Sequence, residues 1–196
     1  SNILIRSVVN NMSFLKRNYK QNIISFDIES TSYVEYKDVS HRDGTVTREV
    51  ERKYAWMYLA DFCEYVAGTY HHNTFRNWKD VVAYLDRLSD FCAKGWYYVI
   101  WVHNLSFEFQ FMKDYMKLTD VFCRKAHNVL KCTYRNIEFR DSLALANCKL
   151  EKLAKNEHLQ VEKAVGDLDY SLIRTPTTPI TDKEMNYQRK DTEVVC

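Results

Sequence analysis

The stretch Trp96–Val102 is apolar or aromatic at every position, and it constrains the fold more than any other segment. A strand that is apolar on both faces lies inside a sheet whose two sides are covered. Residues 54–60 have the same character. They follow a segment, starting at Val46, in which apolar residues occupy even-numbered positions. The sequence therefore predicts strands that enter the centre of a sheet.

The remaining elements are arranged around these strands. Residues 23–29 form a β-branched and aromatic run, and the Asp43-Gly44 turn predicts a hairpin between this run and the next strand, with a further strand ending near Tyr70. Other local patterns predict helices at 78–92, 105–116 and 150–155, a strand at 137–140, a loop at 175–180, and a last helix from Thr181, with Glu184 in its capping box, to the end. Strands followed by alternating strands and helices predict an α/β fold with a mixed β-sheet flanked by helices.

Composition excludes several classes of protein. The chain has 196 residues, is 46% hydrophobic and carries 28 basic against 26 acidic residues, which excludes a disordered polyelectrolyte and a strongly basic nucleic-acid scavenger. The six cysteines form no CxxC pair, so we expect reduced thiols. With no long apolar stretch and no signal peptide, the chain is expected to be cytoplasmic, not secreted, and without a membrane partner.

Residues 1–22 carry a net charge of +4 and are predicted to be a basic N-terminal arm, ahead of a single domain at 23–196.

The first chemical signal is the pair Asp27 and Glu29. At this spacing both side chains leave the same face of a strand, about 6 to 7 Å apart. Such a pair suits two oxygen ligands of a hard cation. Acid-x-acid pairs also occur elsewhere, as in Asp191/Glu193, and by itself the pair is equally consistent with solvated surface charge. It differs from the others because it lies in a hydrophobic strand.

Two further pairs follow at helical spacing. Asn104 and Glu108 share one face at a helix start, where backbone N–H groups favour an anionic ligand such as phosphate. Asn104 could equally be a plain N-cap and Phe107 a plain core residue. Tyr187 and Asp191 form the second pair, on the last helix. Each signal is weak alone, and the order of the three along the chain is the informative feature.

In this order the three motifs resemble those of the 3'→5' proofreading exonucleases of family B DNA polymerases. Residues 139–143 and 150–155, with Gly166–Tyr170, are similar to the protein-primed branch found in phages and linear plasmids. The resemblance spans residues 22–196. It implies an RNase H-like (DnaQ-like) exonuclease fold, and a fragment of a longer polymerase whose third motif lies close to residue 196.

The resemblance also implies a site that binds two divalent cations, Mg²⁺ or Mn²⁺. Carboxylate ligands favour these cations over Zn²⁺. The implied metal ligands and catalytic residues are Asp27, Glu29, Glu108 and Asp191, with Asp27 bridging the cations and Tyr187 orienting the attacking water. The implied contacts to a single-stranded 3' end are Ser30, Asn104, Phe107, Ser142 and Leu143. We expect the histidines, including His71, His72 and His103, at the surface or behind the ligands.

Two positions depart from the family pattern. Glu108 stands where the family has Asp, and Val165 stands where it has Lys, with Lys163 two residues upstream.

The resemblance implies three partners: a DNA 3' end, the polymerase domain of the same parent chain and a terminal priming protein. A net charge of +4 over residues 120–155 agrees with phosphate contact or with a solvated surface. Two alternatives stay open: a standalone DNA or RNA exonuclease of the same fold, and a degenerate domain that binds single strands or a replication partner without efficient cleavage.

Overall fold

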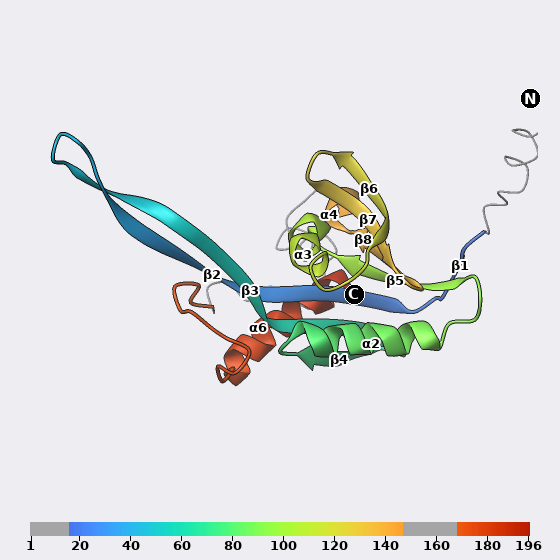
Figure 1. Ribbon diagram of the computed structural model, residues 1–196. Coiled ribbons are helices and arrows are strands. Elements are labelled where there is room, and N and C mark those ends of the chain that lie inside the picture. The colour runs from blue at the N-terminus through green and yellow to red at the C-terminus, as the bar shows by residue number, and fades with distance from the viewer. Residues whose placement is uncertain (1–15, 147–167) are drawn as a thin grey trace, which may run out of the picture.

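The structure is a computed structural model that describes residues 16–146 and 168–196 (Figure 1). The predicted helix at 150–155 and the residues Lys163, Val165, Gly166 and Asp167 lie outside the described residues. So does most of the predicted N-terminal arm, of which residues 18–19 form a strand. The division at residue 22 stays a prediction.

An eight-stranded mixed sheet forms the centre of the molecule, in the order β4-β3-β2-β5-β8-β7-β6 with β1 paired to β5. Its strands are β1 (Asn18–Tyr19), β2 (Ile23–Ser40), β3 (Val46–Val66), β4 (Thr69–Phe75), β5 (Trp96–Val102), β6 (Thr119–Lys125), β7 (Asn128–Tyr134) and β8 (Ile137–Asp141). The neighbours β2, β5 and β8 run parallel, and antiparallel strands extend the sheet on both sides. The apolar strand β5 therefore lies in the interior of the sheet, as predicted.

The described helices are α2 (Trp78–Asp90), α3 (Leu105–Met112), α4 (Leu143–Ala146) and α6 (Asp182–Val195). Side chains of α2 and α3 pack with Ile24, Phe26 and Ile28 of β2 in the main core. Because side chains alternate along a strand, the residues between these three leave the opposite face, and α6 covers that face. The predicted α/β class, with a mixed sheet flanked by helices, is confirmed.

Aromatic packing fills the core between the sheet and α2. The Phe26 ring stacks on Phe62 of β3, with ring centroids 4.4 Å apart, and lies 6.1 Å from Phe139 of β8. Phe62 also packs against Tyr84 of α2. These contacts hold the inner half of β2 rigidly between its neighbours, so the polar residues on its other face have fixed positions.

Several predicted boundaries are wrong. The strand expected to end near Tyr70 is two strands, because Ala67 and Gly68, with φ of 49° and 84°, form a two-residue turn between β3 and β4. Alanine rarely takes such a conformation, so the sequence did not mark this turn. The helix predicted at 105–116 ends at Met112, where the backbone tightens into turns such as Tyr115 N–H to Met112 O. The predicted 175–180 loop and the Thr181 capping box are confirmed.

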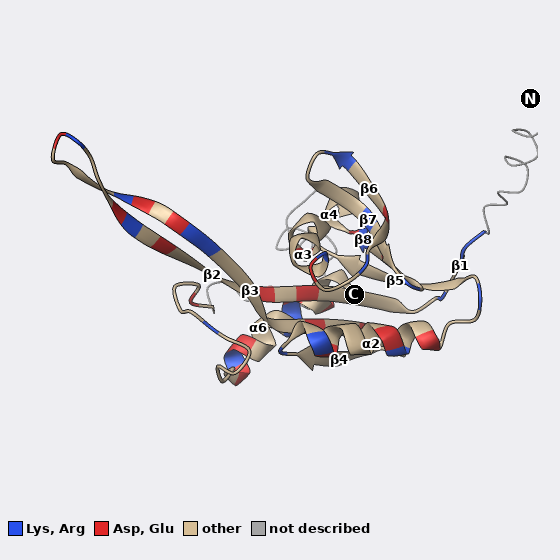
Figure 2. Cartoon of the chain, viewed as in Figure 1, with Lys and Arg blue, Asp and Glu red and all other residues tan. Residues whose placement is uncertain are grey.

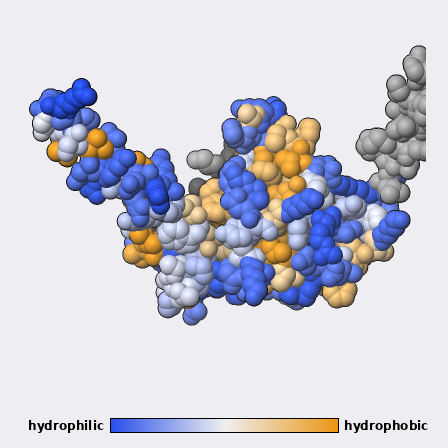
Figure 3. All heavy atoms as spheres, viewed as in Figure 1, coloured by the Kyte–Doolittle hydropathy of each residue, from blue (hydrophilic) through white to orange (hydrophobic). Residues whose placement is uncertain are grey.

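The outer half of the β2–β3 hairpin projects away from the body (Figure 1). Basic and acidic residues are intermixed along it (Figure 2), and its surface is mostly hydrophilic (Figure 3). Strand β2 is much longer than the predicted strand at 23–29, because polar residues on both faces gave no clear signal beyond residue 29. None of the described helices has both the length and the apolar character that a membrane crossing requires.

Candidate active site

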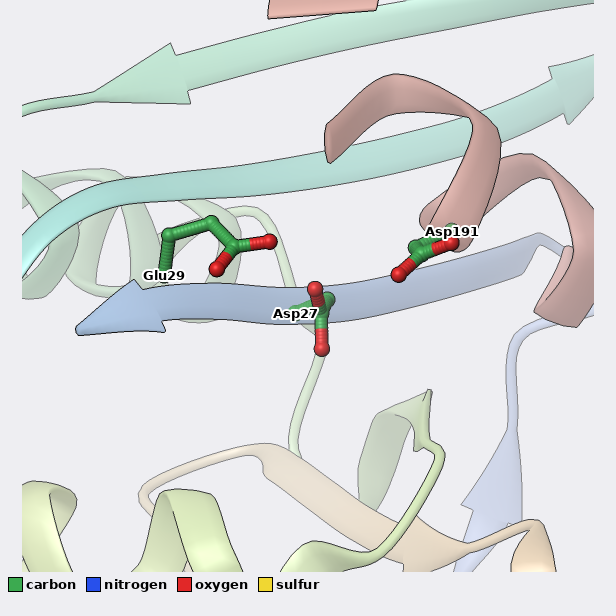
Figure 4. A group of neighbouring side chains, drawn as sticks. All are labelled: Asp27, Glu29 and Asp191. Carbon is green, nitrogen blue, oxygen red and sulfur yellow. The ribbon is translucent and has the colours of Figure 1, made fainter. Parts of the chain in front are cut away.

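Three carboxylates meet at the inner half of β2. Asp27 and Glu29 leave β2, Asp191 leaves α6, and one oxygen from each lies within 4.8 Å of the others (Figure 4). Glu29 and Asp191 are buried, while Asp27 is half-buried. Three negative charges this close repel one another unless a positive charge lies between them. An all-oxygen donor set of this kind fits a hard divalent cation such as Mg²⁺ or Mn²⁺.

These side chains line a cleft of about 530 Å³. Its lining residues are Asp27, Ile28, Glu29, Ser30, Ser32, His103, Asn104, Phe107, Glu108, Tyr170, Tyr187 and Asp191. A register shift between Glu29 and Ser30 marks a bulge in the β2–β3 ladder. Bulges redirect side chains, so Glu29 and Ser30 both line the cleft although they are adjacent in the strand. The structure thus brings together eight of the ten predicted site residues; Ser142 and Leu143 are not among those that line it.

Glu108 lines the same cleft and is only 1% exposed. Burial raises the pKa of Glu108 well above its ordinary value, and the negative charge of Asp27 raises it further. A protonated Glu108 donates a hydrogen bond to Asp27. Its Oε2 is buried and has no hydrogen-bond partner among the described residues. This orphaned oxygen is a second indication that the cleft is built for a cation, which would supply the missing partner.

Gln188 is a site residue that the sequence did not reveal. It is fully buried on α6, and its Nε2 donates a hydrogen bond of 3.0 Å to Oδ2 of Asp27. The neighbouring Tyr187 is also buried, and its hydroxyl lies 3.3 Å from that of Tyr170. Burial is the main cause that raises the pKa of Tyr187, so its hydroxyl stays protonated and can donate.

Asp141, at the end of β8, holds the other wall of the cleft. Its Oδ1 accepts hydrogen bonds from the backbone N–H groups of Asn104 and Leu105, and its Oδ2 accepts one from Ala144. Asn104 occupies the N-cap position of α3, but its side chain makes no capping bond and its φ is 76°. The alternative of a plain Asn104 cap is therefore wrong, since Asp141 caps this helix. The same carboxylate ties the start of α4 to the start of α3.

The predicted nucleic-acid contacts divide into two groups. Ser30, Asn104 and Phe107 line the cleft, and Phe107 is 43% exposed, so its alternative as a core residue is wrong. Ser142 and Leu143 stand at the start of α4, next to the cleft. The Oγ of Ser142 lies 3.1 Å from Nδ1 of His103, which does line the cleft. His103 lines the cleft and is not one of the three converging carboxylate ligands.

A second cavity, of about 690 Å³, lies elsewhere on the molecule, between β3, the start of α2 and the 175–176 loop. Its described lining residues are Trp56, Met57, Asn77, Trp78, Lys79, Val82, Tyr115, Thr175 and Pro176, with no acidic side chain among them. Although it is the larger of the two, its described lining offers no carboxylates for a metal ion. The carboxylate cleft is therefore the candidate active site.

A family model described as DNA polymerase type B, organellar and viral, matches residues 91–194, just over half of the chain. The chain belongs to this family. The resemblance to family B polymerases in the sequence motifs is thus confirmed. The matched region includes Asn104, Glu108 and Asp191, whereas Asp27 and Glu29 lie before it.

Solved structures of phi29 DNA polymerase share the fold of this polymerase-family chain. The complex with single-stranded DNA matches with a TM-score of 0.65 at 15% identity, over 90% of this chain and 30% of that one. The post-translocation binary complex with primer-template DNA matches with a TM-score of 0.66 at 15% identity, over the same shares. The chain therefore spans less than a third of the length of these relatives. No curated protein sequence matches it significantly.

The basic residues of this family B chain are partly engaged in ion pairs. Arg17 pairs with Asp120 and Glu138, and Arg140 pairs with Glu138 as well. Arg135 pairs with two acids of α2. These arginines are less available for phosphate than their number in the sequence indicated. The basic residues of 147–155 lie outside the described residues.

Proposed function

We propose that this chain is the 3'→5' proofreading exonuclease domain of a DNA-directed DNA polymerase. It hydrolyses the 3'-terminal phosphodiester of single-stranded or frayed DNA. The observation that carries the proposal is the meeting of Asp27, Glu29 and Asp191 within 4.8 Å, in a cleft that also presents an exposed aromatic ring. Membership of the type B polymerase family and a fold shared with phi29 polymerase structures that contain DNA support it.

The carboxylates would hold two divalent cations, Mg²⁺ or Mn²⁺. Asp27, Glu29 and Asp191 supply the converging oxygens, and the orphaned Oε2 of Glu108 offers a further one. When bound, such cations stabilise the charge of the phosphate and lower the pKa of water. Zinc fits this all-oxygen donor set less well.

The other residues of the cleft have roles in binding and orientation. Phe107 offers a ring face on which the terminal base stacks, and Asn104 and Ser30 offer hydrogen bonds to the terminal nucleotide. The hydroxyl of Tyr187, next to Asp191 on the helix face, orients the water that attacks the phosphodiester. Ser142, held by His103, and Leu143 flank the path of the strand.

We further propose that the domain has an RNase H-like (DnaQ-like) fold. Its partners would be the polymerase domain of the same parent chain and a terminal priming protein. The activity would be cytoplasmic, because the five cysteines in the described residues are free thiols, as in a reducing compartment.

The test uses the 196-residue chain and a 5'-labelled single-stranded DNA oligonucleotide with Mg²⁺ or Mn²⁺. We expect a ladder of products shortened one nucleotide at a time, and no shortening after Asp27→Ala combined with Glu29→Ala. The matched control is Glu49→Ala with Glu51→Ala, the same acid-x-acid pattern on the exposed projecting hairpin. Absence of cleavage by the unmutated chain in Mn²⁺ would overturn the proposal. Equal cleavage of a matching RNA strand would favour the standalone DNA or RNA exonuclease.

The position of Glu108 favours a second candidate function, a degenerate domain that binds single strands without efficient cleavage. Its carboxyl lies outside the group of three oxygens, and burial and the charge of Asp27 raise its pKa well above the ordinary value. Unimpaired binding of the oligonucleotide, measured by fluorescence anisotropy, together with no cleavage in Mn²⁺ would support this candidate.

A further inference from the structure

The face by which α6 packs on the sheet is unusually polar. Its buried residues are Tyr187, Gln188, Asp191, Thr192 and Val194, of which one is aliphatic. Hydrogen bonds require a defined distance and angle, so polar groups on a packing face fix the position of a helix closely. The position of α6, and with it that of Asp191, therefore depends on its hydrogen bonds to the strands.

These hydrogen bonds gather just after Asp191. The hydroxyl of Thr192 donates to Oδ2 of Asp61 on β3 at 2.6 Å. The hydroxyl of Ser25 on β2 donates to the backbone oxygen of Thr192 at 2.7 Å. Thr192, Asp61 and Ser25 are all completely buried. The residue next to Asp191 is thus held from two strands at once.

His72 of β4 supplies the third attachment. Its Nδ1 lies 2.8 Å from Oδ2 of Asp61, and its Nε2 lies 2.9 Å from Oε1 of Glu193. Ionised carboxylates only accept, so a ring that donates to both is protonated. Burial lowers the pKa of His72, but the bonds to Asp61 and Glu193 outweigh burial and the net shift is upward. The hydroxyl of Thr74 donates to the other oxygen of Asp61.

We propose that Asp61, His72 and Glu193 form a positioning network that holds Asp191 in line with Asp27 and Glu29. The inference rests on the proposed function in so far as these carboxylates bind the cations. Asp61, His72 and Glu193 are not among the described residues that line the cleft. The network acts through α6, because Thr192 and Glu193 directly follow Asp191.

The test measures Mn²⁺ binding to the 196-residue chain by calorimetry, with no DNA present. We expect His72→Ala and Thr192→Val to weaken Mn²⁺ binding about 10-fold or more, as loss of outer-shell support commonly does. Thr192→Val keeps the shape of the side chain, so this variant should stay folded and can test the proposal even if His72→Ala does not fold. The control is His71→Ala, because His71 is exposed on the opposite face of β4 and should leave binding unchanged.

Cleavage assays on the same variants separate this inference from the proposed function. We expect a lower kcat with an unchanged KM for DNA, since Phe107 and Asn104 lie on the other wall. If both variants lower the Tm but bind Mn²⁺ within about twofold of the unmutated chain, the network is only structural and the inference is wrong. If the unmutated chain binds Mn²⁺ but does not cleave DNA, the proposed function is wrong. The positioning network is still supported in that case if the variants bind Mn²⁺ more weakly than the unmutated chain. If the unmutated chain does not bind Mn²⁺, both fail.

Discussion

Asp27 on β2 and Asp61 on β3 are direct partners in the antiparallel ladder, so their side chains leave the same face of the sheet side by side. One accepts a hydrogen bond from Gln188 and the other from Thr192, two residues four positions apart on α6. The helix thus binds both members of the pair. Gln188 is 161 positions from Asp27 in the sequence, and Thr192 is 131 positions from Asp61.

Gln188→Leu should lower kcat about 10-fold while the KM for DNA changes little, because Asp27 loses a hydrogen-bond donor that orients it. Leucine fills the buried volume, so the Tm should hold. Steady-state kinetics with a single-stranded oligonucleotide measures the effect, and Gln110→Leu, at an exposed position of α3, is the control. A raised KM with unchanged kcat would contradict this role.

Phe107→Ala should raise the KM for single-stranded DNA roughly 5- to 150-fold, the range that corresponds to about 1 to 3 kcal/mol of base stacking. The Tm should change little, since the ring is 43% exposed. Phe107→Tyr keeps a ring for stacking and should bind like the unmutated chain. Binding by anisotropy checks the pair; equal losses for both variants would mean that stacking is not the cause.

Asp141→Ala should destabilise the domain by about 0.5 to 2 kcal/mol or more, because three backbone N–H groups at the starts of α3 and α4 lose their acceptor. For a domain of this size each 1 kcal/mol lowers the Tm by about 2 to 4 °C. Differential scanning calorimetry measures the shift. Asp141→Asn keeps one acceptor oxygen and should lose less stability, and an equal loss would count against the capping role.

Glu108→Gln should raise the Tm in EDTA at about pH 7.5, because ionisation of a buried carboxyl with a raised pKa opposes folding above its ordinary pKa. The same change removes a carboxylate from the cleft and should weaken Mn²⁺ binding. Such opposite effects on stability and function are typical of active-site groups. A lower Tm with unchanged Mn²⁺ binding would assign Glu108 a purely structural role.

His72 should make stability depend on pH. Its pKa is raised in the folded state, so its stabilising contribution is complete below the ordinary value of 6.5 and is lost as pH rises through the folded value. The groups that face it are Asp61 and Cys63 from β3 and Glu193 from α6. The Tm difference between the unmutated chain and His72→Gln should therefore shrink as the pH rises above 6.5. A constant difference would show that the ring does not titrate in this range.

Local patterns predicted those parts of the site that depend on local chemistry. The alternation of residues 23–29 indicated that Asp27 and Glu29 share one face, and helical spacing paired Asn104 with Glu108 and Tyr187 with Asp191. Nothing local distinguished Gln188 from the polar residues beside it. Its importance comes from Asp27, which is 161 positions away.

By itself, the sequence determined the α/β class, the interior strand at 96–102 and the set of acidic residues, because periodicity and capping are short-range properties of the chain. Only the tertiary structure decided that Glu29 and Ser30 both line one cleft, that Glu108 is buried in the wall of that cleft, and that Asp141 rather than Asn104 caps α3. It also decided the attachment of α6 through Asp61 and His72. These features depend on strand register and on contacts between distant segments, which are set when the layers pack and which no local pattern encodes.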